Sequence, residues 1–369
     1  MTEIPFYNVD RVYQSQREEF LAIIDRVYST GSMLMGQEIE SAELSMARFC
    51  GRKHAVLVGS CTDALFFALE AVGVKPGDEV LVPAFSFIAS VTPILRIGAI
   101  PVFVDIDPTH FMMDIADAER KVTSATKAIM CVHLFGQTLD IQQLEGFSEK
   151  HGIPLVEDSA QSFGSFSEGR AAGGMGLVSC VSFDPTKVIG AFGNGGLLLS
   201  DDENICNHVR KLHYHGRNKS GDYEILGYNS RMANAQAAIL EFQLKSLPDK
   251  IAERNSVAAQ LDKQLADIKE ITTPQPRVGS THIYHKYVIR AKSRNELMAF
   301  LKRNGVKTMI HYGKALNEHL LFQNFTHRAD GLSAVHHIKQ QVLSLPVYPE
   351  LSAQEISHIC LMIRQFYAG

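Results

Sequence analysis

A single lysine, Lys187, lies among small and apolar residues in the stretch VSFDPTKVIGAFGNGG, residues 181–196. A protein core seldom buries an ammonium group without a partner, and a solvated lysine usually has polar neighbours. Earlier in the chain, Glu157 and Asp158 follow the apolar residues of IPLVED. A carboxylate at the end of a buried strand also needs a partner, which can be a capping N–H group, an arginine or a cationic ring nitrogen.

Another group of polar residues follows an expected strand in VGSCTDAL. Ser60, Cys61 and Thr62 lie where the strand turns into a helix, and the free N–H groups of a helix N-terminus suit a phosphate. A simple helix cap is the better explanation for this turn when it is taken alone. The turn matches neither GxGxxG nor a GKS/T loop, so the sequence supports no dinucleotide site or P-loop there.

Two further strand ends complete a set of ligand-binding groups. Phe85 and Phe87 alternate in VPAFSFIAS, where a strand would point both rings to one face, either into the core or along a flat ligand. Gln161 is placed to bond another polar atom of the ligand that Asp158 contacts, and Ser182 precedes the lysine turn. A lysine, a carboxylate for a ring nitrogen and a phosphate-binding turn together predict pyridoxal phosphate.

The elements that would position these groups alternate between short apolar runs and helical patterns from residue 54 onward. Strands are expected in HAVLVGS, DEVLVPAFSF, IPVFVDID, KAIMCVHLFG and IPLVEDSAQ, with helices in CTDALFFALEAVGV, IASVTPILRIGA and DIQQLEGFSEKHG. This rhythm predicts a parallel sheet covered on both faces, whose ligands bind beyond the carboxyl ends of the strands.

The second part of the chain has a different pattern. Leucines from Leu240 to Leu265 follow at helical spacings, and Pro248 is expected to start a second helix. Later, HIYHKYVIRA is typical of a strand, and NELMAFLKRNGV and SAQEISHICLMIRQFYA are typical of helices. We therefore expect a large domain over residues 1–245 and a small α+β domain over residues 246–369, with the first ~30 residues packed on the small domain.

Composition excludes several classes of function. The 369 residues carry a net charge of −4, and no basic stretch is dense enough to indicate nucleic acid or an anionic membrane. The six cysteines form no CxxC pair, and no set of His, Cys and carboxylates has metal-ligand spacing, so no metal site is predicted. The sequence leaves two positions equally open for His133, one in the core and one in a pocket. Without a signal pattern or a bilayer-spanning apolar run, the chain is expected to be cytoplasmic.

Several segments resemble the sugar aminotransferases of the DegT/DnrJ/EryC1/StrS family, which are fold-type I pyridoxal phosphate enzymes. The resembling segments are spread over the whole chain: GSCTDALFFAL, GDEVLVPAFSFIAS, GAIPVFVDID, HLFGQTLDI, VEDSAQSFGS, SFDPTK, GYNSRMANAQAAI and LPVYPEL. The resemblance implies an α/β fold, in which a large domain has a mainly parallel, seven-stranded type of sheet between helices and a small α+β domain follows at the C-terminus.

The resemblance also implies roles for residues already singled out. Lys187 would form a Schiff base with the cofactor aldehyde, Asp158 would pair with the pyridine nitrogen, and Gln161 would contact the ring hydroxyl. Ser182 and the turn Ser60–Cys61–Thr62 would hold the phosphate. Cys61 stands where the family commonly has a small residue or threonine, which changes little if backbone N–H groups make the phosphate contacts.

Further roles follow from the same resemblance. Phe87 would stack on the cofactor ring. Asn229, in GYNSRM, would reach the phosphate of the neighbouring subunit's cofactor, which implies a homodimer with shared active sites. His215 and His311 match stretches that line family active sites and are weaker candidates for substrate contacts. Asn194, in GNGG, stands where many members carry an acidic residue, so the substrate can be oriented differently.

The reaction implied by the resemblance moves an amino group from L-glutamate to a keto-sugar, while the cofactor alternates between pyridoxal and pyridoxamine phosphate. The expected acceptor is a nucleotide-linked keto-deoxysugar for cell-surface polysaccharide or secondary-metabolite biosynthesis. A non-nucleotide keto-sugar or a cyclitol ketone is the alternative acceptor. A non-catalytic regulatory or binding protein that kept the fold is the alternative from another class. Lys187 argues against the family's dehydratases, which have histidine in its place.

Overall fold

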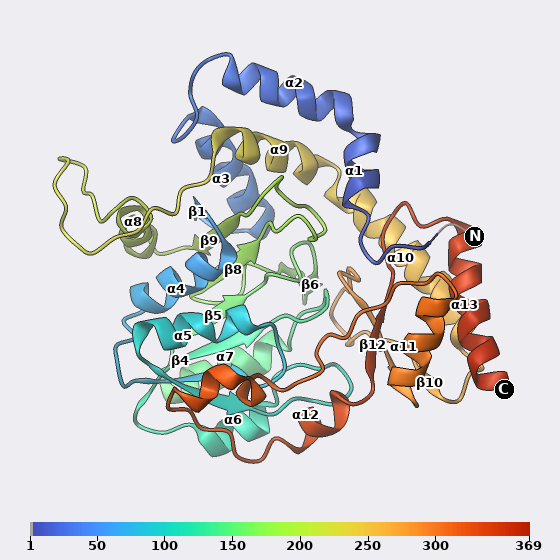
Figure 1. The fold of residues 1–369 in the computed structure, drawn as a ribbon. Helices are drawn as coiled ribbons and strands as arrows, with labels where there is room; N and C mark the ends of the chain where they lie inside the picture. The colour runs from blue at the N-terminus through green and yellow to red at the C-terminus, as the bar shows by residue number, and fades with distance from the viewer. Residues whose placement is uncertain (1–2) are drawn as a thin grey trace.

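The computed structural model describes residues 3–369, and its central feature is a seven-stranded sheet (Figure 1). The strand order is β1-β9-β8-β5-β4-β2-β3. The strands are β1 His54–Val58, β2 Glu79–Pro83, β3 Ile100–Val104, β4 Thr126–Val132, β5 Leu155–Asp158, β8 Val178–Ser182 and β9 Gly196–Ser200. Only β9 in this sheet runs against its neighbours, so the predicted α/β class with a mainly parallel sheet is confirmed.

The shared strand direction brings several loops to one edge of the sheet. After β1, β2, β4, β5 and β8 the chain continues into residues 59–62, 84–90, 133–137, 159–161 and 183–187. β9 runs the opposite way, and its first residue, Gly196, pairs with Ser182, so residues 193–195 lie at the same edge. This carboxyl edge is where open α/β sheets bind their ligands.

Helices cover both faces of the sheet. α4 Cys61–Ala71, α5 Thr92–Ile97 and α8 Glu203–Leu212 pack on one face, while α3 Gln37–Cys50 packs on the other, against α9 Asn234–Lys245. α6 Ile115–Lys121 contacts β3, and α7 Ile141–His151 contacts β5. A 3₁₀ helix, η1 Ile88–Ser90, precedes α5, and β6 Phe166–Ser167 pairs with β7 Arg170–Ala171. Strands covered on both faces explain the continuous apolar runs in the sequence.

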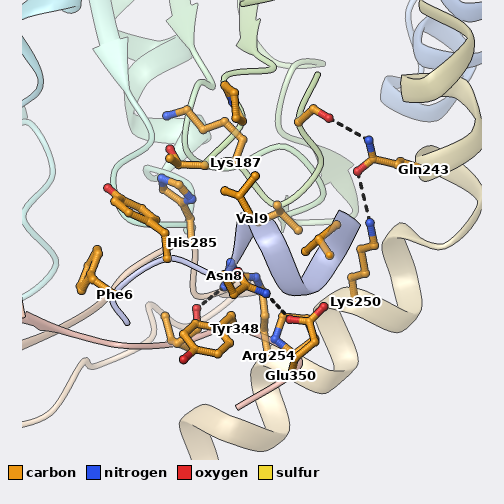
Figure 2. Close-up of a pocket in the computed structure, with 18 of the residues that line it drawn as sticks. Phe6, Asn8, Val9, Lys187, Gln243, Lys250, Arg254, His285, Tyr348 and Glu350 are labelled. Carbon is orange, nitrogen blue, oxygen red and sulfur yellow. Dashed lines mark hydrogen bonds between the residues drawn. The ribbon is translucent and has the colours of Figure 1, made fainter. Parts of the chain in front are cut away.

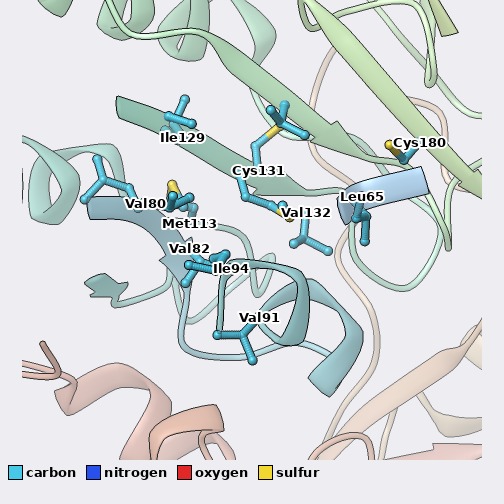
Figure 3. Close-up of a cluster of buried hydrophobic side chains, with 14 of the residues drawn as sticks. Leu65, Val80, Val82, Val91, Ile94, Met113, Ile129, Cys131, Val132 and Cys180 are labelled. Atoms are coloured by element: carbon cyan, nitrogen blue, oxygen red, sulfur yellow. The ribbon is translucent and has the colours of Figure 1, made fainter. Parts of the chain in front are cut away.

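The core of this region is built from small, branched and sulfur-containing side chains. Figure 3 shows Val80 of β2 and Ile129 and Cys131 of β4 near Leu65 of α4 and Ile94 of α5, all of them 0–1 % exposed. Burying a side chain of this size contributes roughly 1.5–3 kcal/mol to folding. All six cysteines are free and buried, as reduced core thiols would be.

A second, smaller sheet follows the long helix α10 Leu247–Leu265. It contains β10 Ile271–Thr272, β11 Tyr287–Ala291 and β12 Val342–Leu345, all antiparallel. α11 Arg294–Arg303 and α13 Ala353–Ala368 share a core with α10 and this sheet. Pro248 lies in the first turn of α10, so the predicted helix start is confirmed. No helix within residues 3–369 is long and apolar enough to cross a membrane.

The N-terminal residues contact both parts of the chain. Ile4 bridges Val306 and lies in the core of the smaller sheet. Arg11, in α1 Val9–Ser15, forms a salt bridge of 2.7 Å with Glu355 of α13. α2 Arg17–Tyr28 instead packs on α9, beside α3 (Figure 1). The first residues therefore join the C-terminal helices to the helical layer of the large sheet.

Part of the C-terminal half returns to the large sheet. This segment contains η2 Leu316–Glu318, η3 Leu320–Gln323 and α12 Ser333–Ile338. Phe322 packs edge to face on Phe103 of β3, with ring centroids 5.2 Å apart, and the Phe103 N–H donates to the Arg328 carbonyl at 2.8 Å. The segment thereby covers the edge strand β3, which would otherwise present unpaired backbone groups.

Two strands are shorter than their apolar runs predicted. β2 ends at Pro83, so the prediction that Phe85 and Phe87 share one face of a strand is wrong. Phe85 is 1 % exposed in the core, whereas Phe87 is 54 % exposed. In HIYHKYVIRA only Tyr287–Ala291 forms a strand, because the preceding residues leave the sheet to cross toward the loops of the large sheet.

Candidate active site

A cavity of about 820 Å³ opens at the carboxyl edge of the large sheet, where residues 285–286 and 309–312 face the strand ends. All the predicted site residues line it except Asn229 and His215. Those that the cavity brings together are Ser60, Cys61, Thr62, Phe87, Asp158, Gln161, Ser182, Lys187, Asn194 and His311. The last residues of β5 and β8, the chain after β1, β2, β5 and β8, and the segment before β9 supply all of these except His311.

The turn at residues 60–62 forms the start of α4. Ser60 caps the helix, because its Oγ accepts a hydrogen bond from the Asp63 N–H at 3.1 Å. The N–H groups of Cys61 and Thr62 have no intrahelical partner, as in the first turn of any helix, so an anion can accept from them. A Cβ atom on Gly196 would lie 2.4 Å from the Ser60 carbonyl group, so β9 can pass this turn only with glycine there.

Asp158 ends β5 with its carboxylate at the cavity. Its Oδ2 accepts from the Ser90 hydroxyl at 2.7 Å, and its Oδ1 accepts from the Ala160 N–H at 3.1 Å. Burial raises the pKa of Asp158, and these two hydrogen bonds only partly offset that effect. A buried carboxylate of this kind is stabilised in its charged form by a cation placed against it.

Glu157, its neighbour, is enclosed by the protein. It accepts hydrogen bonds from three backbone N–H groups of the 173–176 loop, from the hydroxyls of Ser159 and Ser179, and from His133 Nε2 at 3.0 Å. A backbone N–H donates to His133 Nδ1, so the proton of this histidine is on Nε2. Burial alone would raise the pKa of Glu157, but the hydrogen bonds hold it below its usual range. Of the two positions considered for His133, the core position is correct.

Gln161 is held by two hydrogen bonds. Its Oε1 accepts from the Phe135 N–H at 3.1 Å, and its Nε2 donates to the Tyr312 hydroxyl at 3.1 Å. One amide proton of Gln161 therefore remains for a ligand. The rings of Phe87 and Tyr312 lie 6.4 Å apart between centroids. The exposed face of Phe87 is thus available to a flat aromatic ligand in this cavity.

Lys187 follows a tight turn after β8. Its N–H donates to the Asp184 carbonyl at 2.9 Å, and the Thr186 N–H and hydroxyl both donate to Asp184 Oδ1. Burial lowers the pKa of Lys187, although nearby thiol and carboxylate groups, Cys61 first among them, act in the opposite direction. A lowered pKa increases the fraction of neutral amine, which is the form that attacks a carbonyl carbon.

The other predicted residues in the cavity differ in burial. The Ser182 hydroxyl accepts from the Asp184 N–H at 3.3 Å, and Asn194 is exposed. His311 lies with its Nδ1 2.8 Å from the Ser344 hydroxyl, and burial together with two nearby lysines lowers its pKa to about 3. His311 is therefore a neutral group at neutral pH, suited to hydrogen bonding rather than to charge pairing.

Asn229 and His215 lie outside this cavity. Both are exposed on the loop between α8 and α9, which projects from the rest of the chain (Figure 1). The Asn229 Oδ1 accepts from Arg231 Nη2 at 3.1 Å. Because neither residue lines the cavity of its own chain, a role for either in catalysis requires a site on another subunit.

Several residues that line the cavity were not identified from the sequence. They are Tyr7, Ser90, His285, Lys286 and Tyr312. Ser90 lies in the SFIAS stretch at a predicted strand end, which is a usable signal. Lys286 is a single lysine in the apolar run HIYHKYVIRA, the same signal that distinguished Lys187. Tyr7 comes from the N-terminal segment and carries no local signal.

These groups fit pyridoxal phosphate. The buried carboxylate of Asp158 suits a protonated ring nitrogen, the free N–H groups of the 60–62 turn suit a phosphate, and the amine of Lys187 suits an aldehyde. In the described residues, no group of three His, Cys, Asp or Glu side chains is placed to hold a metal ion. The chemistry of the cavity is therefore that of an organic cofactor bound by a lysine, a carboxylate and a helix start.

Comparison with known proteins gives matches over nearly the whole chain. Residues 14–364 match the DegT/DnrJ/EryC1/StrS aminotransferase family. The chain is 35 % identical to a pleiotropic regulatory protein of Geobacillus stearothermophilus, over 99 % of this chain and 98 % of that protein. It is 34 % identical to a UDP-N-acetyl-3-dehydro-alpha-D-glucosamine 3-aminotransferase of Acidithiobacillus ferrooxidans (100 % and 99 % covered). It is also 34 % identical to a UDP-2-acetamido-2-deoxy-3-oxo-D-glucuronate aminotransferase of Pseudomonas aeruginosa (97 % and 98 % covered).

Solved structures also match the fold over nearly the whole chain. DesV of S. venezuelae, crystallised with a ketimine intermediate, superposes with a TM-score of 0.96 at 32 % identity and covers 99 % of both chains. NtdA of Bacillus subtilis, crystallised with bound cofactor PMP, superposes with a TM-score of 0.93 at 28 % identity, over 100 % of this chain and 86 % of that chain. Both sheets and the cavity between them lie within the matched residues.

Proposed function

Because the chain belongs to the DegT/DnrJ/EryC1/StrS aminotransferase family, we propose that it moves the amino group of L-glutamate to a nucleotide-linked 3-keto sugar. The chain is a pyridoxal phosphate-dependent aminotransferase. The observation that carries the proposal is the joint presence of Lys187, Asp158 and the 60–62 turn in one cavity. The nucleotide and the 3-keto group are supported by the two UDP-sugar relatives, whose names place the keto group at carbon 3.

In this proposal, the cofactor is held by residues at the strand ends. The first turn of α4 and Ser182 bind the phosphate, Gln161 donates its remaining amide proton to the ring hydroxyl, and Phe87 covers one ring face. When bound, pyridoxal phosphate supplies an aldehyde that bonds to amines and a ring that takes up negative charge. Lys187 would hold the cofactor through that aldehyde when no substrate is present.

Asp158 keeps a proton on the ring nitrogen of the cofactor. Hydrogen bonds from Ser90 and the Ala160 N–H fix the orientation of its carboxylate. Burial raises the pKa of this carboxyl group, and a cation placed against it favours the ionised form. The buried position therefore makes the interaction with a protonated ring nitrogen strong.

Lys187 transfers the proton during the reaction. Its amine takes a proton from the substrate carbon that bears the nitrogen and later returns one, as general base and acid. The lowered pKa of this buried lysine favours the neutral amine, which is the form that acts as the base. Its turn, fixed by Asp184, keeps the amine at the cavity wall.

The acceptor sugar is bound in the remaining part of the cavity. A volume of about 820 Å³ lies within the range of pockets that hold a cofactor and a small substrate. A non-nucleotide keto-sugar or a cyclitol ketone remains the alternative acceptor. In either case the product serves polysaccharide or secondary-metabolite biosynthesis. We place the reaction in the cytoplasm, which the six free cysteines support.

A homodimer with shared active sites is part of this proposal. Asn229 lies on a projecting loop outside its own cavity, as a residue serving the partner's cofactor would. Two large apolar side chains on this loop are exposed, Tyr223 by 73 % and Leu226 by 82 %, and Met35 is 57 % exposed. Arg231 links the loop to Met35. Exposed apolar groups of this size are typical of an interface with another chain.

A regulatory protein is the second candidate function, because the Geobacillus relative carries that name. The two candidates differ in turnover. Purified protein with pyridoxal phosphate, L-glutamate and UDP-linked 3-keto sugars should release 2-oxoglutarate and a 3-amino sugar, detected by mass spectrometry. A protein that binds the cofactor yet releases no 2-oxoglutarate with any keto-sugar or cyclitol ketone would reject the enzyme and favour the regulatory role.

A further inference from the structure

A second lysine, Lys286, faces the cavity, and the proposed transamination does not use it. Lys286 lies just before β11 and is only 6 % exposed. Its Nζ donates to the Tyr7 hydroxyl at 3.2 Å and lies 5.1 Å from the ring centroid of Phe6 and 4.3 Å from that of Tyr7. Within residues 3–369, no carboxylate lies within salt-bridge distance of this amine. A buried ammonium with only aromatic and hydroxyl neighbours is costly.

The charged groups around Lys286 are mostly positive. Lys286 lines both the large cavity and a smaller pocket, which Lys187 and Arg254 also line (Figure 2). Burial lowers the pKa of Lys286 well below its ordinary value, Lys187 and Arg254 lower it further, and Asp184 acts in the opposite direction. Four basic side chains, Lys187, Lys250, Arg254 and Lys286, line the smaller pocket with one carboxylate, Glu350. An anion bound beside them would offset the excess positive charge.

A polar group beside Lys286 has no hydrogen-bond partner. His285 is 3 % exposed, and its Nδ1 is buried without any hydrogen-bond partner. His285 lines the same two cavities as Lys286, and Figure 2 shows it on the Lys187 side of the smaller pocket. Burial lowers the pKa of His285 well below its ordinary value, so its ring is neutral. Buried polar atoms are nearly always paired, so an unpaired nitrogen on a residue that lines a cavity indicates a nearby ligand position.

The other buried cations nearby are already partnered. Arg254 Nη1 donates to the carbonyl groups of Tyr284 and Val347 at 3.3 and 2.6 Å. Lys250 Nζ donates to the Gln243 side chain at 3.3 Å, and Lys250 lines only the smaller pocket. Arg254 and Lys250 therefore have carbonyl and amide oxygens as acceptors, whereas Lys286 has only the Tyr7 hydroxyl in the described part of the chain.

We propose that Lys286, oriented by Tyr7 and assisted by His285, binds a carboxylate of the substrate, and that this is the α-carboxylate of the amino-acid donor. The inference rests on the proposed function, because the donor must bring its α-carbon next to Lys187. Lys187 and Lys286 line both the large cavity and the smaller pocket, whereas Asp158 lines only the large cavity. An ammonium–carboxylate contact is a strong, charge-assisted hydrogen bond.

The carboxylate has a second possible source, which the test separates. A uronate acceptor, such as the sugar named for the Pseudomonas relative, also carries a carboxylate. A neutral UDP-linked 3-keto-N-acetylglucosamine does not. Measuring the glutamate half-reaction and the keto-sugar half-reaction separately, with both the neutral and the uronate acceptor, distinguishes the donor from the acceptor.

The experiment uses Lys286→Met in the holoenzyme, with Lys250→Met as the matched control. Titration calorimetry with glutarate, a dicarboxylate that cannot react, should give a dissociation constant raised about 10- to 100-fold in Lys286→Met and unchanged in the control. The KM for glutamate should rise by a similar factor, while the half-reaction of the neutral keto-sugar is retained. The melting temperature of Lys286→Met should stay level or rise, because methionine replaces a buried ammonium group.

Each outcome decides the proposal. Wild-type affinity for glutarate in Lys286→Met would overturn it, and so would a loss confined to the uronate half-reaction, which would assign the lysine to the acceptor. Wild-type protein that binds glutarate but never releases 2-oxoglutarate would reject the proposed function and leave the carboxylate site standing. If Lys286→Met fails to fold, Tyr7→Phe serves instead, and it should weaken glutarate binding in the same direction by a smaller factor.

Discussion

The carboxylates of Glu157 and Asp158 leave β5 in opposite directions, although the two residues are adjacent. Asp158 lines the cavity, whereas Glu157 is fully buried among protein donors that include Ser179 and His133. Successive side chains of a strand point to opposite sides, so the Asp158 carboxylate is available to a ligand and the Glu157 carboxylate bonds to the protein. Substitutions at the two positions should therefore have different consequences.

Asp158→Asn should keep the fold and bind the cofactor but lose activity. The amide has the same size, yet it cannot hold the proton on a ring nitrogen through charge, so the glutamate half-reaction should slow by at least about 100-fold. Stopped-flow absorbance of the cofactor measures this rate, and a cofactor titration serves as the binding control. A near-normal rate would mean that no carboxylate is needed, since Glu157 points away from the cavity.

Glu157→Gln should lower stability rather than chemistry. Six donors converge on this carboxylate, and a neutral amide would leave several of them unsatisfied in the interior. Breaking such a buried charged network typically costs about 3–5 kcal/mol of unfolding free energy. Urea unfolding measures the loss, and the activity per folded molecule should be retained. A variant as stable as the wild type would contradict the structural role of Glu157.

Lys187→Ala should abolish the covalent link to the cofactor. After borohydride reduction of the wild type, mass spectrometry of the peptides should find the cofactor on Lys187. Lys286→Met should keep that modification and provides the control for a second lysine at the same cavity. A cofactor attached to Lys286 in the wild type would reverse the roles of the two lysines.

His282 should make the protein less stable in acid. Its ring stacks on Tyr284, its Nδ1 accepts from the Tyr284 N–H at 2.9 Å, and burial lowers its pKa to about 3. The unfolded chain therefore binds a proton that the folded protein does not. The stability from this residue is present above its unfolded pKa of about 6.5 and is lost as the pH falls toward the folded value.

His282→Asn tests this dependence, because the asparagine oxygen can still accept from the Tyr284 N–H while it does not titrate. Between about pH 7 and about pH 4, its melting temperature should fall less than that of the wild type. His337→Asn, at an exposed histidine on α12, should follow the wild-type curve. Equal slopes for His282→Asn and the wild type would show that His282 already takes up its proton in the folded state.

Much of the site could be predicted because its signals are local. Polar residues directly after apolar strands, such as Ser60 and Asp158, mark the carboxyl edge of a parallel sheet, and the sheet brings these ends together. Tyr7 and Lys286 could not be found this way. Tyr7 reaches the cavity because the N-terminal segment crosses to it, and Lys286 faces it because the chain is irregular before β11.

The incorrect expectation about Phe85 and Phe87 has a related cause. Apolar residues continue past Pro83, so the pattern extends beyond the point where the strand ends. The backbone turns toward η1 there, and the two rings separate into the core and the cavity. The pattern of apolar residues shows that a strand is present more reliably than it shows at which residue the strand ends.

Asn229 gives the prediction that tests whether the two subunits of a dimer share their active sites. If this residue contacts only the partner's cofactor, each active site combines Lys187 from one subunit with Asn229 from the other. A heterodimer of Lys187→Ala and Asn229→Ala subunits then has one site with both defects and one site with neither. Random mixing of equal amounts makes half of the dimers mixed, so activity should return to about one quarter of the wild type.

A matched mixture supplies the control. Lys187 and Asp158 line the same cavity of one chain, so heterodimers of Lys187→Ala and Asp158→Asn subunits have a defect in each site and should stay inactive. The comparison requires that Asn229→Ala alone is clearly impaired and that native mass spectrometry detects the mixed dimers. Mixed dimers without recovered activity would place Asn229 in its own subunit's site or outside catalysis. A fully active monomer would reject the shared site directly, since Asn229 does not reach the cavity of its own chain.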